Sequence, residues 1–194
     1  MPELRHPRHG PDAPGGPGGG RRGAGGGRGR EGPGGGPVTR VLVLGYGNPG
    51  RRDDGLGPAF ARRVEDWAGD RDPGQPCIAV QVAYQLNIED AALVAEHDHV
   101  VFVDATTQGP PVQFSELSPS AHTCEFTTHS VTPAGILGLA RDVFGARPGA
   151  WALAVRGYEF GDFGERLSSQ ATENLDLAWQ RFRDFLDGIQ GERT

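Results

Sequence analysis

From residue 38 onward, short apolar stretches alternate with segments in which apolar residues recur every three or four positions. The first pattern is typical of buried strands and the second of amphipathic helices. The apolar stretches predict five strands, at Val38–Leu44, Cys77–Ala83, His99–Val103, Val112–Leu117 and Ala150–Val155. We expect Cys77, at the start of an apolar run, to lie in the core.

The periodic segments between these stretches predict four helices. The first begins near Leu56, and the second runs from a cap at Asn87 to about Glu96, with Ile88 facing inward. Thr132-Pro133 combines an N-cap residue with proline at the first helical position, so a third helix should open there and reach Phe144. Ser168 or Ser169 begins the last helix.

Strand followed by helix, repeated along the chain, is the pattern of a sheet covered on both faces. We therefore predict an α/β fold: a three-layer α/β/α sandwich with a twisted, mostly parallel five-stranded sheet, phosphorylase/hydrolase-like. In such open sheets, ligands bind beyond the carboxyl ends of the strands. Polar residues in the loops at that edge are the candidates for chemistry.

The chain divides into two parts by composition. Residues 1–37 hold 15 of the 32 glycines and 7 of the 16 prolines, with almost no apolar side chains. Such a segment cannot bury enough surface to offset the entropy of ordering it, so we expect a disordered tail. The folded domain should span residues 38–190.

Charge and cysteine content narrow the function classes. The whole chain carries a formal charge of −6 and the tail +3, so residues 38–194 carry −9. A domain this acidic repels a phosphate backbone, which argues against nucleic acid as a partner. There is no apolar stretch of membrane-spanning length and no signal-peptide pattern. Two cysteines do not make a disulfide framework. We expect a cytoplasmic protein, monomeric by default.

The loop after the first strand, Gly45–Gly57, reads GYGNPGRRDDGLG. Its first three glycines match the G-x-G-x-x-G fingerprint of dinucleotide sites. That interpretation fails because the helix must begin within the glycines, whereas Pro49 removes a donor there and the helical pattern starts near Leu56. Gly45, Gly47 and Asn48 are instead expected to shape the floor of a substrate cleft.

Two adjacent carboxylates, Asp53 and Asp54, follow the glycines. Near a helix start, the dipole favours an ionised acid, which can bind a cation or orient water. The alternative is that one of them merely caps the helix, which would still leave the other for chemistry. The residue pattern leaves open which of the two is the free acid.

Asp104 directly follows the buried run HVVFV, where a charge must be paired, hydrogen-bonded or coordinating. Either backbone amides satisfy it or it belongs to the same site as Asp54. His129 precedes the third predicted helix. Two carboxylates and an imidazole suit nickel or zinc with open coordination positions. A separate Cys/His site at His122, Cys124 and His129 is disfavoured, because its spacing is not that of structural zinc sites.

With these residues identified, the chain resembles the nickel-iron hydrogenase maturation endopeptidases over about residues 39–188. The resemblance rests on four stretches in the family's order, namely GYGNPGRRDDGLG at Gly45–Gly57, FVDA at Phe102–Ala105, TTHSVTPAGILGLA, and Gly164–Ser168. It implies an aspartyl-type endopeptidase that removes the C-terminal extension of a hydrogenase large-subunit precursor after nickel insertion. It also implies Asp54, Asp104 and His129 as the catalytic residues that contact nickel, which the substrate supplies. With Asp54 in that role, we place Asp53 in the substrate cleft.

Three rivals remain at this point. Peptidyl-tRNA hydrolase also has a G-x-G-N-P-G loop, but it needs a histidine-asparagine pair shortly after the loop, where this chain has Asp53-Asp54-Gly55. A non-catalytic docking module for a metal-loaded partner would use the same residues as the peptidase. A cysteine peptidase built on Cys124 lacks a recognisable oxyanion loop.

Overall fold

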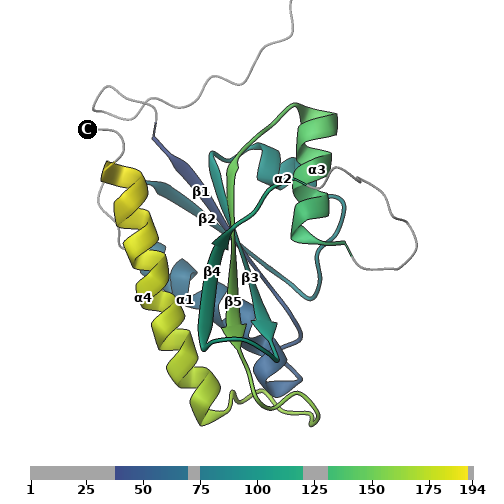
Figure 1. The fold of residues 1–194 in the computed structure, drawn as a ribbon, viewed down its shortest axis with the longest axis vertical. Coiled ribbons are helices and arrows are strands. Elements are labelled where there is room, and N and C mark those ends of the chain that lie inside the picture. The colour runs from purple at the N-terminus through teal and green to yellow at the C-terminus, as the bar shows by residue number, and fades with distance from the viewer. Residues whose placement is uncertain (1–37, 70–74, 120–130, 192–194) are drawn as a thin grey trace, which may run out of the picture.

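The computed structural model describes residues 38–69, 75–119 and 131–191. These form one five-stranded sheet with the order β2-β1-β3-β5-β4, in which only β4 runs antiparallel to its neighbour (Figure 1). The strands are β1 (Arg40–Tyr46), β2 (Cys77–Ala83), β3 (His99–Thr106), β4 (Val112–Glu116) and β5 (Gly149–Arg156). The predicted mostly parallel five-stranded sheet is therefore confirmed.

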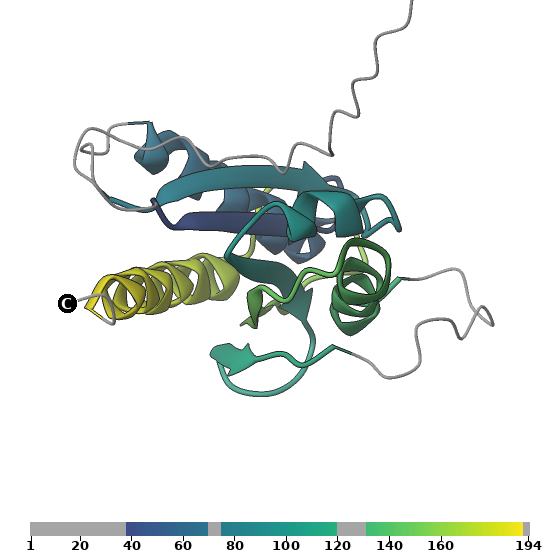
Figure 2. The ribbon, with the colours of Figure 1, turned by 90° about the horizontal axis from the view of Figure 1, so that it is seen from above.

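Helices cover both faces of this sheet, so the three-layer prediction is also confirmed. The helices are α1 (Leu56–Ala68), α2 (Asp90–Ala95), α3 (Pro133–Phe144) and α4 (Ser169–Gly191), with a short 3-10 helix η1 (Arg52–Gly55) before α1. One hydrophobic cluster joins α1 and α4 to the sheet, and a second joins α2 and α3 to the opposite face. Figures 1 and 2 show α4 and α3 on opposite sides of the strands.

The alternation of side chains along the central strands builds both clusters. In β1, Val41 and Val43 belong to the α1/α4 cluster, whereas Leu42 and Leu44 belong to the α2/α3 cluster. Successive side chains of a strand point to opposite faces, so a continuous apolar run is what a doubly covered strand requires. All four residues are fully buried.

Two helix starts show how well local signals specify structure. α3 begins at Pro133 as predicted, and the Thr132 hydroxyl accepts a hydrogen bond from the Gly135 amide at 3.1 Å. The predicted cap at Asn87 is wrong, because α2 begins only at Asp90. The Asp90 carboxylate accepts from the Asn87 amide at 2.8 Å, which forms a turn before the helix. Ile88 in this turn is exposed rather than inward-facing.

The prediction for Cys77 is also wrong, because its side chain is exposed. Cys77 opens β2, which lies at the edge of the sheet and is covered less than β1 or β3. The predicted tail, residues 1–37, lies outside the described residues. None of the helices in the described ranges is long and apolar enough to cross a membrane.

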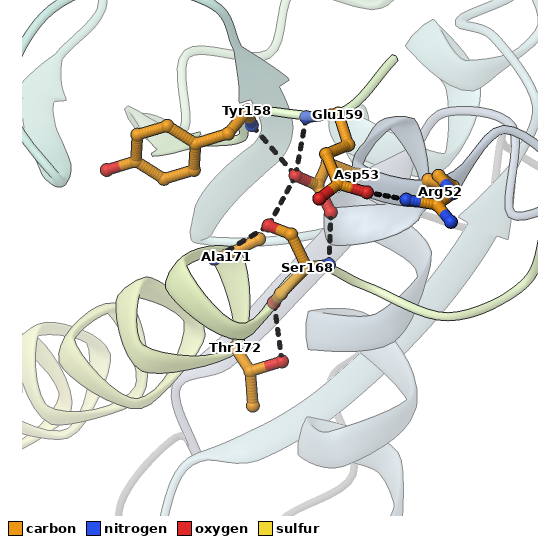
Figure 3. A network of polar contacts seen from close by, with 7 residues as sticks. All are labelled: Arg52, Asp53, Tyr158, Glu159, Ser168, Ala171 and Thr172. Carbon is orange, nitrogen blue, oxygen red and sulfur yellow. Dashed lines mark hydrogen bonds and ion pairs between the residues drawn. The ribbon is translucent and has the colours of Figure 1, made fainter. Parts of the chain in front are cut away.

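A buried carboxylate joins the start of α1 to the far end of the chain. Asp53, in η1, is fully buried. Its carboxylate accepts hydrogen bonds from the amides of Tyr158 (2.8 Å), Glu159 (2.9 Å) and Ser168 (2.7 Å), and from the Ser168 hydroxyl (2.7 Å) (Figure 3). Four donors satisfy a charge that would otherwise be costly to bury.

The segment between β5 and α4, residues 157–168 (the β5–α4 loop), is further fastened by backbone bonds. The Gly164 amide donates to the Gly50 carbonyl at 2.9 Å, and the Arg52 amide donates to the Gly164 carbonyl at 2.7 Å. Arg52 adopts a positive φ of 52°, an unusual conformation for a non-glycine residue, and its side chain pairs with Glu159. The loop is thereby held against the start of α1.

We predict that Asp53→Asn destabilises the fold. An amide has one acceptor oxygen where the carboxylate has two, so its NH₂ group would face donors and leave buried groups unsatisfied. We expect a loss of about 3 kcal/mol, which corresponds to a fall in Tm of roughly 10 °C. Thermal unfolding followed by circular dichroism measures this.

The matched control is Asp66→Asn, since Asp66 is an exposed aspartate of α1. It should unfold at the same temperature as the unchanged protein. If Asp53→Asn also unfolded at that temperature, the Asp53 carboxylate would not stabilise the fold by holding the β5–α4 loop.

Candidate functional site

The turn that leaves β1, Gly47–Arg51 (the glycine loop), depends on glycine at its first position. Gly47 has φ of 138°, and a Cβ atom built there would lie 2.1 Å from the Asp54 carbonyl oxygen. No other residue fits this conformation and this contact. The Gly47 amide also donates to the Ala83 carbonyl at the end of β2, at 3.1 Å. The loop is therefore tied to the neighbouring strand.

The start of α1 packs directly on the carboxyl ends of β1 and β3. A Cβ atom at Gly57 would lie 2.3 Å from the Tyr46 carbonyl oxygen and 2.6 Å from that of Val103. A Cβ atom at Gly45 would lie 2.2 Å from the Gly57 carbonyl oxygen. α1 begins at Leu56, after the glycine loop, as the argument against a dinucleotide site assumed. Gly45 and Gly47 support this edge from inside the fold.

Asp54 is held at the edge of the sheet by the glycine loop. One of its carboxylate oxygens, Oδ2, accepts from the Asn48 amide at 3.2 Å. The Asn48 side chain in turn accepts from the Gly50 amide at 2.9 Å, which fixes the turn. Asp54 is only partly buried, and in the described part of the chain no donor contacts its Oδ1. That oxygen is available for a ligand.

Asp104 lies near the end of β3, and its immediate neighbour is Tyr46 at the end of β1. The strand register pairs Gly45 with Val103, so Tyr46 and Asp104 come next on adjacent strands. The Tyr46 hydroxyl donates a hydrogen bond to the Asp104 carboxylate. The Ala105 amide also donates to Asp104 Oδ1, at 2.8 Å. Tyr46 was not singled out from the sequence, because it stands between two glycines and carries no motif.

Burial raises the pKa of Asp104 to about 6, and the negative charge of Asp54 adds to this increase. The hydrogen bonds from Ala105 and Tyr46 oppose it, since they stabilise the ionised form. The pKa of Tyr46 is raised by its own burial and by the Asp104 carboxylate, so its hydroxyl remains protonated and can donate. Asp54 and Asp104 are therefore close enough to interact electrostatically.

The two adjacent acids of the loop have separate roles. Asp53, predicted to line the substrate cleft, lies in the interior, where both its oxygens accept protein hydrogen bonds. That prediction is corrected, because a fully buried and saturated carboxylate offers nothing to a substrate. Neither acid caps α1, which has no side-chain cap. Of the pair, Asp54 remains for chemistry.

His129 lies outside the described residues, as do His122 and Cys124, so its role remains a prediction. The nearest described element is α3, whose first turn is capped by Thr132. α3 leads into β5, which is parallel to β1 and β3, so its N-terminus faces the carboxyl edge of the sheet where Asp104 lies (Figure 1). Within residues 38–69, 75–119 and 131–191, there is no group of three or more potential metal ligands.

The arrangement brings two carboxylates, Asp54 and Asp104, to one edge of the sheet. A carboxyl group with a pKa near 6 can exchange a proton close to neutral pH, as a general base requires. A partly free carboxylate beside it can contact a cation. Paired acids in unequal environments are a common arrangement at catalytic sites.

Comparison with known proteins identifies the fold. No protein-family profile matches the chain, and no curated protein sequence matches it. Solved structures do match. The hydrogenase 2 maturation peptidase from a Thaumarchaeota archaeon is 22% identical, with a TM-score of 0.55 over 77% of this chain and 99% of that one.

Two further structures give the same result. The hydrogenase maturating endopeptidase HybD from E. coli is 18% identical, with a TM-score of 0.57 over 78% of this chain and 94% of that one. The NiFe hydrogenase maturation protease HycI from Thermococcus kodakarensis is 20% identical, with a TM-score of 0.56 over 77% and 93%. The chain therefore has the α/β fold of the hydrogenase maturation proteases.

Proposed function

We propose that this protein is an endopeptidase that removes the C-terminal extension of a nickel-iron hydrogenase large-subunit precursor. The observation that carries the proposal is the pairing of Asp54 with Asp104 at the carboxyl edge of the sheet. The shared fold supports it, since the matching structures include several hydrogenase maturation proteases. The enzyme would act in the cytoplasm as a monomer.

Nickel belongs to the substrate in this proposal. The precursor arrives with nickel bound, and Asp54, Asp104 and His129 contact that ion. Carboxylate oxygen and imidazole nitrogen are suitable donors for it. Contact with the ion distinguishes a loaded precursor from an empty one and brings the scissile peptide to the acid pair.

The residues of the chain then perform hydrolysis. Asp104 accepts a proton from a water molecule as the water oxygen attacks the carbonyl carbon of the scissile peptide. The carbon–nitrogen bond breaks, and the leaving nitrogen takes the proton from Asp104. We assign the role of base to Asp104 because its pKa of about 6 lies nearer to neutral pH than that of an ordinary carboxylate.

We predict that Asp104→Asn reduces trimming of nickel-loaded precursor by roughly 10²- to 10⁴-fold, the usual effect of losing a general acid or base. Asp54→Asn should also slow trimming, because it removes a carboxylate that contacts the nickel. Both residues are only partly buried, so the variants should fold. Mass spectrometry of the precursor measures trimming, and circular dichroism checks the fold.

Glu65→Gln, an exposed change on α1, is the matched control and should trim at the normal rate. Full activity of both aspartate variants would contradict the proposed site. Binding of precursor without any trimming, by the unchanged protein, would favour the docking-module alternative.

Nickel dependence is tested by incubating the purified protein with nickel-loaded and nickel-free precursor. We expect cleavage of the loaded form only, because the ion is the feature that the acid pair contacts. A precursor loaded with zinc shows whether the identity of the ion matters. Equal trimming of loaded and empty precursor would refute recognition through nickel.

The pH dependence follows from the raised pKa of Asp104. Its carboxylate form is populated as the pH rises through about 6, so kcat/KM should fall about tenfold per pH unit below that value and level off above it. Tyr46→Phe removes a hydrogen bond to the ionised form and should move the profile to higher pH. Carbon-13 NMR of the Asp104 carboxyl in Asp54→Asn should show the opposite shift, because a neighbouring negative charge is removed. Shifts in the same direction would contradict the assignment.

A further inference from the structure

Two strongly exposed aromatic side chains, Tyr84 and Phe163 (the flanking aromatics), lie beside the glycine loop. Tyr84 is 71% exposed and follows β2, whereas Phe163 is 92% exposed and belongs to the β5–α4 loop. They are 79 positions apart in the sequence. Large aromatic side chains at this level of exposure gain nothing from the protein's own core.

Backbone hydrogen bonds place each aromatic next to the glycine loop, one on either side. Tyr84 follows Ala83, whose carbonyl accepts from the Gly47 amide at 3.1 Å. Phe163 precedes Gly164, which exchanges two bonds with Gly50 and Arg52, at 2.9 and 2.7 Å. The glycine loop, which positions Asp54, is thereby bordered at its first residue by Tyr84 and at its far end by Phe163.

The segment that carries Phe163 is fastened at both ends. The amides of Tyr158 and Glu159 before it, and that of Ser168 after it, donate to the buried Asp53 carboxylate. A partner that binds Phe163 therefore does not have to order this loop, so the entropic cost of binding is small. Aromatic residues, Tyr, Trp and Phe, are enriched at protein interfaces, and Tyr is among the residues that most often dominate their binding energy.

We propose that the flanking aromatics are the anchors by which the enzyme holds its protein substrate on both sides of the catalytic acids. The inference rests on the proposed function. The partner that binds these aromatics is the hydrogenase large-subunit precursor, which contacts them with apolar side chains on either side of its scissile segment. Continuity with the acid site supports this occupant, since the glycine loop lies between the anchors and its Asn48 amide donates to the Asp54 carboxylate at 3.2 Å.

The test is steady-state trimming of nickel-loaded precursor by Tyr84→Ser and Phe163→Ser in the full chain. Each variant should raise KM about tenfold, because a truncated anchor weakens binding, while kcat stays within about twofold of normal. The double variant should raise KM by about a hundredfold, since the two sites are independent. Both side chains are exposed, so Tm should not change.

The matched control is the double variant Val143→Ser/Phe144→Ser. These residues are 65% and 53% exposed at the end of α3, toward the opposite edge of the sheet (Figure 1). KM should be normal in this control. An unchanged KM in the aromatic variants, or an equal increase in the control, would overturn the proposal. If the aromatic variants lost self-association without a change in KM, the proposal would also be overturned, because the flanking aromatics would then contact a second copy of the chain.

Failure of the proposed function gives a different result. If the unchanged protein leaves the extension intact, the peptidase assignment fails. The affinity of each variant for the precursor, measured by biolayer interferometry, then shows whether the flanking aromatics still bind the precursor. Weaker binding by the aromatic variants alone would support that contact. Equal binding by all variants would refute it.

Discussion

The carboxylate of Asp53 accepts hydrogen bonds from residues that lie 105 to 115 positions further along the chain. Through these bonds it fixes the relative positions of η1, the β5–α4 loop and the start of α4. A charge with this degree of burial can only exist where all its donors are in place, so the three segments must come together in one arrangement. The position of the neighbouring residue, Asp54, therefore depends on the same arrangement.

This explains why two adjacent acids can have such different roles. In η1, Asp53 is fully buried, whereas Asp54 accepts a hydrogen bond from Asn48 after β1 and lies near Asp104 of β3. The backbone around these two residues is held by close contacts at Gly47 and Gly57. A side chain at either glycine would collide with carbonyl oxygens. Because the Asn48 amide holds only Oδ2 of Asp54, Oδ1 meets no donor among the described residues and can contact a ligand.

The sequence predicts the framework well because the signals for it are local or periodic. The limits of β2 and α3 are correct to the residue, and the apolar runs identify the interior strands β1, β3 and β5. The inward placement of Ile88 and the burial of Cys77 were wrong, because the coverage of a turn and of an edge strand depends on distant segments. Asp53 and Tyr46 show the same limit at the site. Their partners come from other parts of the chain, and nothing in the local sequence specifies those contacts.

The site combines two opposing electrostatic effects. Burial and the Asp54 charge favour the neutral form of Asp104, whereas the Tyr46 hydroxyl and the Ala105 amide favour the ionised form. A cation placed between the acids would reverse the first effect, because it stabilises both carboxylates at once. Asp104 is thus more completely ionised when a metal is present than when it is absent. A substrate that brings its own metal would in this way prepare the site for the reaction, and an empty precursor would meet two acids that repel each other.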